Sequence, residues 1–406
     1  MSACLGFDVR NFKSVLFKII LFVVMGSLCG VIGSAFSKSV GFVTAFRENH
    51  GWMLFLLPIA GIITVWLCRW LKTEGVGTTE VFSSAENGKP LPLWLFPAVF
   101  VSTVLTHLCG GSAGKEGSAL QIGGGISALV SKVFKVDEKT RNTLVLSGMA
   151  ALFSAVFSTP IAAAVFAVEA VRIKKMRIFN VFPCLLSSFL AYAVSLLLKI
   201  KPERFRVGTI PEIEFFMILK VLLIAAAAAV VGVIFCQSLH YFHKGFARLI
   251  SNGYIRIFIG AVIVVLLSVL IGSNDYNGSS AEGITRIFET GKVRFEAFAL
   301  KLLLTVITMG CGFKGGEIIP SLFIGAALGG AISAVLGLSV PFGAAVGMAA
   351  LFCSVTKCPF ATFFLCLELF GFKTAGFIVL AVLISLICSG KFSLYGDVKP
   401  LFKRYV

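Results

Sequence analysis

Long uncharged blocks dominate the pattern of polar and apolar positions along this chain. Six windows contain no Asp, Glu, Lys or Arg, namely 19–37, 52–68, 178–198, 221–239, 257–274 and 374–390. Each is close to the length of about 20 residues with which a helix crosses the apolar core of a bilayer. No strand-like alternation accompanies them, and backbone groups in lipid must be satisfied within helices. The pattern therefore predicts an all-α polytopic membrane protein.

The two halves of the chain share a sequence pattern. The hexapeptide GMAALF occurs at Gly148 and again at Gly347, and each copy is followed at the same distance by a proline and a glutamate. Upstream, TVLT (103–106) is matched by TVIT (305–308). Self-similarity over this length indicates an internal repeat of about two hundred residues.

Each half holds seven sizeable apolar segments, several of them too short to cross a bilayer alone. In the first half they are roughly 14–46, 52–71, 91–109, 116–130, 142–157, 160–175 and 178–198. In the second half they are roughly 213–244, 253–272, 294–310, 318–335, 341–355, 359–370 and 374–389. An odd number per repeat gives the repeats opposite orientations, a common plan among transporters. We predict two inverted transmembrane repeats, 1–207 and 208–406, built from broken helices.

Three glycine-rich stretches interrupt the apolar pattern: EGVGTTE (74–80), GGSAGKEGSA (110–119) and GCGFKGGEIIP (310–320). Each precedes an apolar segment, so each is expected to supply a helix N-terminus whose unpaired amides and dipole attract an anion. Tight helix packing is the alternative explanation for small residues in a membrane. A phosphate-binding loop is excluded, because Lys115 is followed by glutamate and no strand comes before it.

Two of these stretches carry charges deep in apolar sequence. Lys115 and Glu116 are the only charged residues between 89 and 132, and Lys314 and Glu317 form a similar pair between 301 and 357. Charge inside a membrane is costly and tends to be functional. Ionised, Glu116 would occupy an amide-lined site as a tethered anion, and protonated it would swing away and admit a free anion. One residue would then couple the movement of protons and anions.

The remaining composition adds few alternatives. The net charge of +17 fits cations that flank the membrane spans and touch anionic lipid, and it also draws anions toward a pore. The chain has no basic run with interleaved aromatic residues, so we expect no nucleic-acid partner. His240 and His243 lie one helical turn apart, but no further ligand completes a metal site, and we expect no metal or cofactor. An intramembrane enzyme using Glu116 and Glu317 as acid and base remains an alternative without a supporting motif.

The combination of motifs resembles the CLC family of chloride channels and anion/proton antiporters. GKEGSALQIGGG is similar to the family's G-[KR]-E-G-P element, GVGTT lies where the family has G-S-G-I-P, and GGEIIP lies where it has G-x-F-x-P. SLYGD places Tyr395 at the family's pore tyrosine. The resemblance covers essentially the whole membrane domain. It implies an inverted-repeat helical fold, a homodimer with one pore per subunit, Glu116 as the external gating glutamate, and no cytoplasmic regulatory domain.

Several positions depart from chloride-selective members of that family. Val76 stands where they carry a serine hydroxyl, Ser118 replaces a proline, and Ala170 replaces the second glutamate of their proton entry path. Glu317 lies on the helix that holds the anion, which is similar to the bacterial fluoride/proton antiporter branch. That branch often has Met or Asn at the position of Val76 and Thr at the position of Ile319, where this chain is apolar.

We therefore predict a multi-pass protein of the bacterial plasma membrane that exchanges fluoride for protons. Chloride/proton exchange and passive anion conduction are the alternatives. The expected partners are halide anions, protons, membrane lipid and a second copy of the chain. Glu116 is the predicted gating and proton-coupling residue. The predicted anion-binding positions are Val76, Gly77, Gly117, Glu317, Ile318, Ile319 and Tyr395. The predicted pore-lining side chains are Phe82, Lys115 and Lys314.

Overall fold

The structure is a computed structural model that describes residues 9–171 and 180–396. The helices of the first half are α1 (Val9–Asn49), η1 (Gly51–Leu56), α2 (Leu57–Trp70), α3 (Thr78–Asn87), α4 (Leu95–Leu108), α5 (Glu116–Val133), α6 (Glu138–Phe157), α7 (Pro160–Ala170) and α8 (Val181–Leu197). Those of the second half are α9 (Phe215–Leu249), α10 (Gly253–Ile271), α11 (Ala281–Thr290), α12 (Ala297–Gly310), α13 (Ile318–Val335), α14 (Val340–Thr356), α15 (Pro359–Phe370), η3 (Phe372–Thr374) and α16 (Ala375–Cys388).

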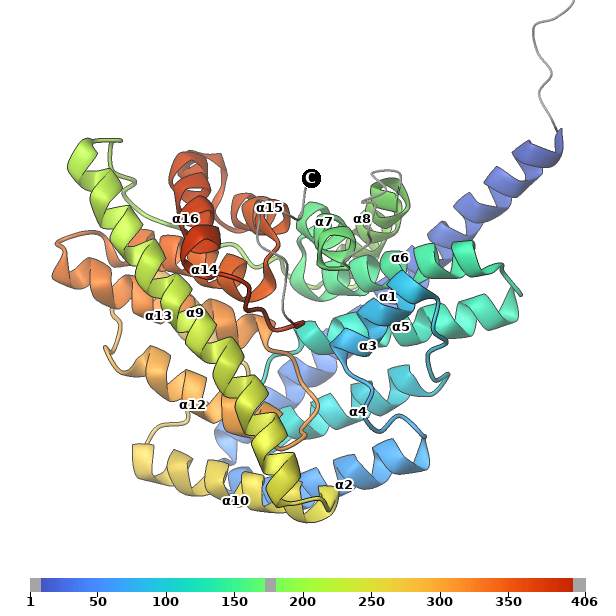
Figure 1. Ribbon diagram of the computed structural model, residues 1–406, viewed down its shortest axis with the longest axis horizontal. Helices are drawn as coiled ribbons and strands as arrows, with labels where there is room; N and C mark the ends of the chain where they lie inside the picture. The colour runs from blue at the N-terminus through green and yellow to red at the C-terminus, as the bar shows by residue number, and fades with distance from the viewer. Residues whose placement is uncertain (1–8, 172–179, 397–406) are drawn as a thin grey trace, which may run out of the picture.

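The α-helices of the two halves correspond one to one in chain order. Figure 1 shows the first half, from blue to green, beside the second half, from yellow-green to red, with α4 opposite α12 and α5 opposite α13. The seven apolar segments predicted in each half all coincide with helices. Two of the predictions, 160–175 and 178–198, also reach into residues 172–179, which lie outside the described residues.

The structure adds one short helix to each half that the apolar pattern did not predict. These are α3 and α11, of ten residues each. Their sequences, TTEVFSSAEN and AEGITRIFET, contain no long apolar run. Helix α3 forms because its N-cap residue Gly77 is followed three residues later by Glu80, whose carboxylate accepts the Gly77 amide at 2.8 Å. The described α-helices therefore number eight in each half, and the predicted count of seven covers only the apolar ones.

Helix length separates membrane-crossing elements from interior ones. Within the described residues, five helical stretches are long and apolar enough to cross a bilayer: 14–49, 51–70, 215–249, 253–271 and 318–335. In the last of these, which is α13, 83% of the apolar window is buried inside the protein, against 33–39% in the other four. Shorter apolar helices such as α4, α7, α12 and α15 have only 11–14 residues. They cannot cross alone, so their ends lie inside the protein.

Glycine pairs hold the central helices together in the same way in both halves. A Cβ atom at Gly123 of α5 would lie 2.2 Å from the Gly148 carbonyl oxygen of α6, and one at Gly325 of α13 would lie 2.5 Å from the Gly347 carbonyl oxygen of α14. Neither backbone leaves room for a side chain. Close backbone approach at small residues is the usual way in which membrane helices pack, and it explains the GGG run of α5.

Two glutamates tie the halves together reciprocally. Glu169, near the end of α7, accepts the amides of Phe360 (3.3 Å) and Ala361 (2.8 Å) in the first turn of α15. Its counterpart Glu368, near the end of α15, accepts the amides at 161 (3.1 Å) and 162 (2.8 Å) in the first turn of α7. A carboxylate that accepts first-turn amides also interacts favourably with the helix dipole. The repeated glutamate of the sequence therefore has a structural use.

Candidate functional site

The first turns of α5 and α13 meet between the two halves. The Gly114 amide donates to the Gly316 carbonyl and the Gly316 amide donates to the Gly114 carbonyl, both at 2.7 Å. A Cβ atom at Gly117 would lie only 2.6 Å from Gly316 Cα. These positions admit only glycine without a shift of the backbone. Two helix N-termini, each with unpaired first-turn amides, are thereby held against each other.

This contact fixes how the two halves align. Gly114 pairs with Gly316, an offset of 202 residues (316 − 114). Under that offset Lys115 corresponds to Glu317, and both are N-cap residues of their helices. Glu116, the first residue of α5, corresponds to Ile318. The two lysine–glutamate pairs are therefore similar in composition, but the second pair is spaced differently around its helix start.

Glu116 is completely buried at the start of α5. Its Oε2 accepts the Lys115 amide at 3.1 Å, so the carboxylate folds back over the N-terminus of its own helix. Its Oε1 has no hydrogen-bond partner within the described residues. The ammonium of Lys115 points elsewhere and donates to Ser37 Oγ of α1 at 3.1 Å. No ion pair of Glu116 occurs in the described part of the chain.

The second pair of charges is arranged differently. Lys314 donates to the Val76 carbonyl oxygen at 2.6 Å, which joins the loop before α13 to the loop before α3. Glu317 is partly buried, and its Oε2 has no hydrogen-bond partner among the described residues. Each lysine therefore positions a loop, and neither neutralises the glutamate next to it in the sequence.

A cavity of about 530 Å³ opens beside these helix starts. Its wall brings together five of the predicted site residues, drawn from both halves: Val76, Gly77, Lys314, Glu317 and Tyr395. The other predicted site residues do not line this cavity: Phe82, Lys115, Glu116, Gly117, Ile318 and Ile319. The site thus has an open side next to Glu317 and a closed side at Glu116.

Aromatic rings separate part of the cavity from the core. The rings of Phe82 and Tyr395 meet edge to face with centroids 4.8 Å apart, and Phe166 lies 6.4 Å from Tyr395 on another side. Tyr395 is only 7% exposed. Its segment is anchored by the Leu394 amide, which donates to the Val355 carbonyl at 2.8 Å. A tyrosine of an interfacial belt would face lipid or water instead.

Two polar residues of the cavity wall, Gln121 and Thr78, were not among the predicted site residues. Gln121 of α5 is 5% exposed and its Nε2 donates to Thr78 Oγ1 of α3 at 3.1 Å. Both line the cavity. The available signal was a lone amide side chain in the apolar run SALQIGGG, one helical turn beyond Gly117.

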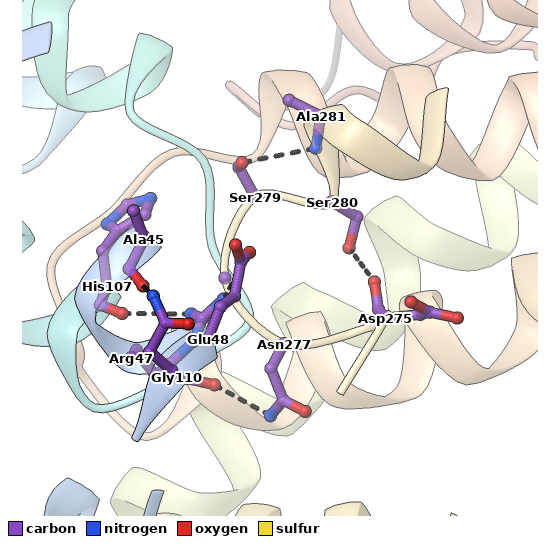
Figure 2. A network of polar contacts seen from close by, with 12 residues as sticks. Ala45, Arg47, Glu48, His107, Gly110, Asp275, Asn277, Ser279, Ser280 and Ala281 are labelled. Atoms are coloured by element: carbon purple, nitrogen blue, oxygen red, sulfur yellow. Dashed lines mark hydrogen bonds and ion pairs between the residues drawn. The ribbon is translucent and has the colours of Figure 1, made fainter. Parts of the chain in front are cut away.

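A network of hydrogen bonds fixes the loop before α5 to residues of α1 and of the second half (Figure 2). Arg47 Nη1 donates to the His107 carbonyl at 3.0 Å, and Asn277 Nδ2 donates to the Gly110 carbonyl at 2.9 Å. The fully buried Lys301 donates to the carbonyl of residue 278 at 2.7 Å. The same carbonyl accepts the amide of residue 113 at 3.1 Å. These bonds attach the end of α4 and the glycine loop of the first half to the segment before α11.

The two halves contain matching sets of helices, and short helices from both halves start inside the protein and face each other. These features define a polytopic membrane protein of the discontinuous-helix transporter type. The chain belongs to the voltage gated chloride channel family, whose model matches residues 60–390. This confirms the predicted all-α fold, the resemblance and the multi-pass membrane location.

Individual members of the family resemble the chain over most of its length. The chain is 31% identical over 379 residues to a chloride/fluoride channel protein of Pseudomonas syringae pv. tomato, covering 91% of this chain and 83% of the relative. It is 24% identical over 387 residues to an H+/Cl− exchange transporter of Vibrio parahaemolyticus, covering 86% of this chain and 81% of the relative. The crystal structure of a CLC-type fluoride/proton antiporter matches with a TM-score of 0.91 and 34% identity, covering 95% of this chain and 98% of the other.

Proposed function

We propose that this protein exchanges a halide, primarily fluoride, for protons across the membrane. Two relatives support the substrate: a chloride/fluoride channel protein at 31% identity and a fluoride/proton antiporter at 34%. The observation that carries the mechanism is the buried Glu116 carboxylate, which lies at two facing helix N-termini with one oxygen unpartnered in the described chain. Among predicted site residues, it alone combines a carboxylate with full burial at a helix start.

The exchange follows from the charge of that carboxylate. Ionised, Glu116 occupies the amide-rich space at the start of α5 as a tethered anion, stabilised by the first-turn dipole. Protonation removes the charge and with it the attraction to the amides. A free anion then takes the vacated place. Proton binding and anion entry are thereby linked at one residue, because both depend on the same carboxylate leaving the same amides.

The anion is held by backbone groups in this proposal. Gly117 lies in the first turn of α5, and Ile318 and Ile319 lie in the first turn of α13, where amides lack intrahelical acceptors. Fluoride must exchange its hydration for several close donors. The ring of Tyr395 lines the cavity and packs against the ring of Phe82, and this apolar contact excludes water beside the anion.

The same proposal assigns transport and not chemistry to the site. Glu116 and Glu317 lie at the starts of two different helices, and no hydrogen bond to a nucleophile or a second proton donor is made by either within the described residues. We propose a homodimer in lipid, as the family resemblance implies. Exposed apolar side chains on the outer faces of α8 and α16 are available for such contacts: Phe189, Leu197, Leu383 and Ile387.

Reconstitution in proteoliposomes tests the function. We expect an outward fluoride gradient to drive protons uphill into the vesicles, recorded with a fluoride electrode and an internal pH probe. Equal turnover of chloride and fluoride would assign the protein to chloride/proton exchange, which the relative from Vibrio parahaemolyticus performs by its name. Anion flux without proton movement would make it a passive channel.

A further inference from the structure

The loop before α3 offers the cavity fewer donors than its sequence suggests. Val76 has no side-chain donor, and its carbonyl oxygen already accepts from Lys314 at 2.6 Å. The Gly77 amide is also in use, since it donates to Glu80 Oε2 at 2.8 Å. An anion that enters from the cavity therefore finds neither a hydroxyl at position 76 nor a free amide at position 77.

Two neighbouring side chains carry polar groups at the same wall. Gln121 Nε2 donates to Thr78 Oγ1 at 3.1 Å, which joins the third helix to the fifth. The Gln121 Oε1 atom is buried and has no hydrogen-bond partner within the described residues. Leaving such an atom unsatisfied destabilises the folded state. This orphan atom is an acceptor, which a halide cannot satisfy, so an anion at this wall requires a donor from the same pair of side chains.

We propose that Thr78 and Gln121 together supply the side-chain donor that Val76 lacks, and that they bind the desolvated fluoride on the cavity side of the site. This inference rests on the proposed function and names two residues that select its anion. The Thr78 oxygen accepts from the amide, so its own hydrogen is left to point elsewhere, and the cavity lies beside it.

The pair has a second arrangement with the same outcome. The terminal torsion of glutamine has a broad, nearly two-fold profile, so the amide turns by half a rotation. Gln121 Oε1 then accepts the Thr78 hydroxyl and the amide nitrogen faces the cavity with two hydrogens. In the first arrangement the available donor is the Thr78 hydroxyl, and in the second it is the Gln121 amide, which then occupies the position of the orphan oxygen. The unpartnered Glu317 Oε2 at the same wall makes such a donor necessary, because that oxygen repels an anion while it is ionised.

Isosteric variants test the pair in the full-length protein. Thr78→Val and Gln121→Met remove the donors and keep the size of the side chains. We expect each to raise the apparent KM for fluoride about tenfold, the effect of losing a hydrogen bond to a charged group. The proton-to-fluoride ratio should stay unchanged because Glu116 is intact. The double variant should be no worse than either single one, since the two residues act as a unit.

Controls separate donor loss from misfolding. Thr78→Ser keeps the hydroxyl and should restore the wild-type KM. Ser131→Ala removes a hydroxyl further along α5 that has no described partner, and it should also behave as wild type. Thermal unfolding in detergent verifies that all variants fold. Wild-type KM values in folded Thr78→Val and Gln121→Met would overturn the pair and leave the proposed function standing.

Direct binding distinguishes the two failures. Sodium fluoride is titrated into detergent-solubilised wild type and Thr78→Val by calorimetry. Weaker binding in the variant supports the pair even where the wild type moves no protons, which would count against the exchange function alone. Equal binding in both proteins contradicts the pair whatever the transport result.

Discussion

The glycine loops before α5 and α13 have the same backbone arrangement, but their charged residues stand at different positions. Each contributes one amide and one carbonyl to the Gly114–Gly316 contact, and each starts a helix two residues later. At the N-cap, the first half has Lys115 and the second has Glu317. At the next position, the first half has Glu116 and the second has an isoleucine.

This difference shows how a repeat produces an asymmetric site. The carboxylate at the first helical position is sealed inside the protein and folds over its own amides, whereas the carboxylate at the N-cap borders the open cavity. A shift of one position along a helix changes the direction of a side chain by about 100°. The same backbone therefore gives one buried carboxylate suited to gating and one that sets the potential of the cavity.

Replacing Glu116 is expected to have the largest effect, because it removes the buried carboxylate. Glu116→Gln is nearly isosteric but neither ionises nor carries a proton. We expect complete loss of uphill proton movement on a fluoride gradient, with fluoride flux either blocked or uncoupled from protons. The measurement is proton uptake in proteoliposomes. Persistent uphill pumping by Glu116→Gln would exclude the tethered-carboxylate mechanism.

Replacing Val76 tests the cavity side next. Val76→Ser adds the hydroxyl that chloride-selective relatives are expected to carry, and it widens the space beside the anion. We expect the preference for fluoride over chloride to fall about tenfold, in line with one additional hydrogen bond to an anion. The ratio of initial fluxes in matched gradients reports it. Val76→Thr, which is closer in size to valine, separates the hydroxyl from the added space.

Much of this architecture was predictable from the sequence, because long uncharged runs and repeated motifs are local signals. The helix starts at Glu116 and Ile318 follow directly from the glycine stretches. The start of α3 was expected from the stretch EGVGTTE, but the helix was not among the predicted apolar segments, because its buried apolar residues are only Val81, Phe82 and Ala85. The different spacing of the two lysine–glutamate pairs also follows from the sequence. The offset of 202 residues between TVLT (103–106) and TVIT (305–308) places Lys115 opposite Glu317, and the contact between Gly114 and Gly316 has the same offset.

The two lysines show most clearly which contacts could not be predicted from the sequence. Lys314 reaches a carbonyl 238 residues away and Lys115 reaches a hydroxyl 78 residues away, and nothing in the sequence around them indicated these partners. The glycine-rich stretches that contain the lysines carry no information about such long-range partners. The pairing of Thr78 with Gln121 is likewise set by how α3 packs on α5.

Glu317 offers a matched comparison with Glu116. Glu317→Gln removes a negative charge from the cavity wall and leaves the gate intact. We expect coupled pumping to continue, with the apparent KM falling about fivefold for both halides, because one repulsive charge worth roughly 1 kcal/mol is lost. Concentration series with fluoride and chloride supply the KM values. Loss of coupling as complete as in Glu116→Gln would show that the two carboxylates share one task.

The smallest effect is expected at Tyr395, where the ring rather than a charge forms the wall. Tyr395→Ala opens a gap beside Phe82, whose ring lies 4.8 Å from that of Tyr395. The gap removes a wall and no charge, so we expect the proton-to-fluoride ratio of the folded variant to fall about twofold as uncoupled anions pass, the effect of an edge-to-face contact worth about 0.5–1.5 kcal/mol beyond the burial of the ring. Tyr395→Phe keeps the ring and should retain tighter coupling than alanine. If both variants couple as the wild type does, the ring is a packing element and the closed side of the site depends on Glu116 alone.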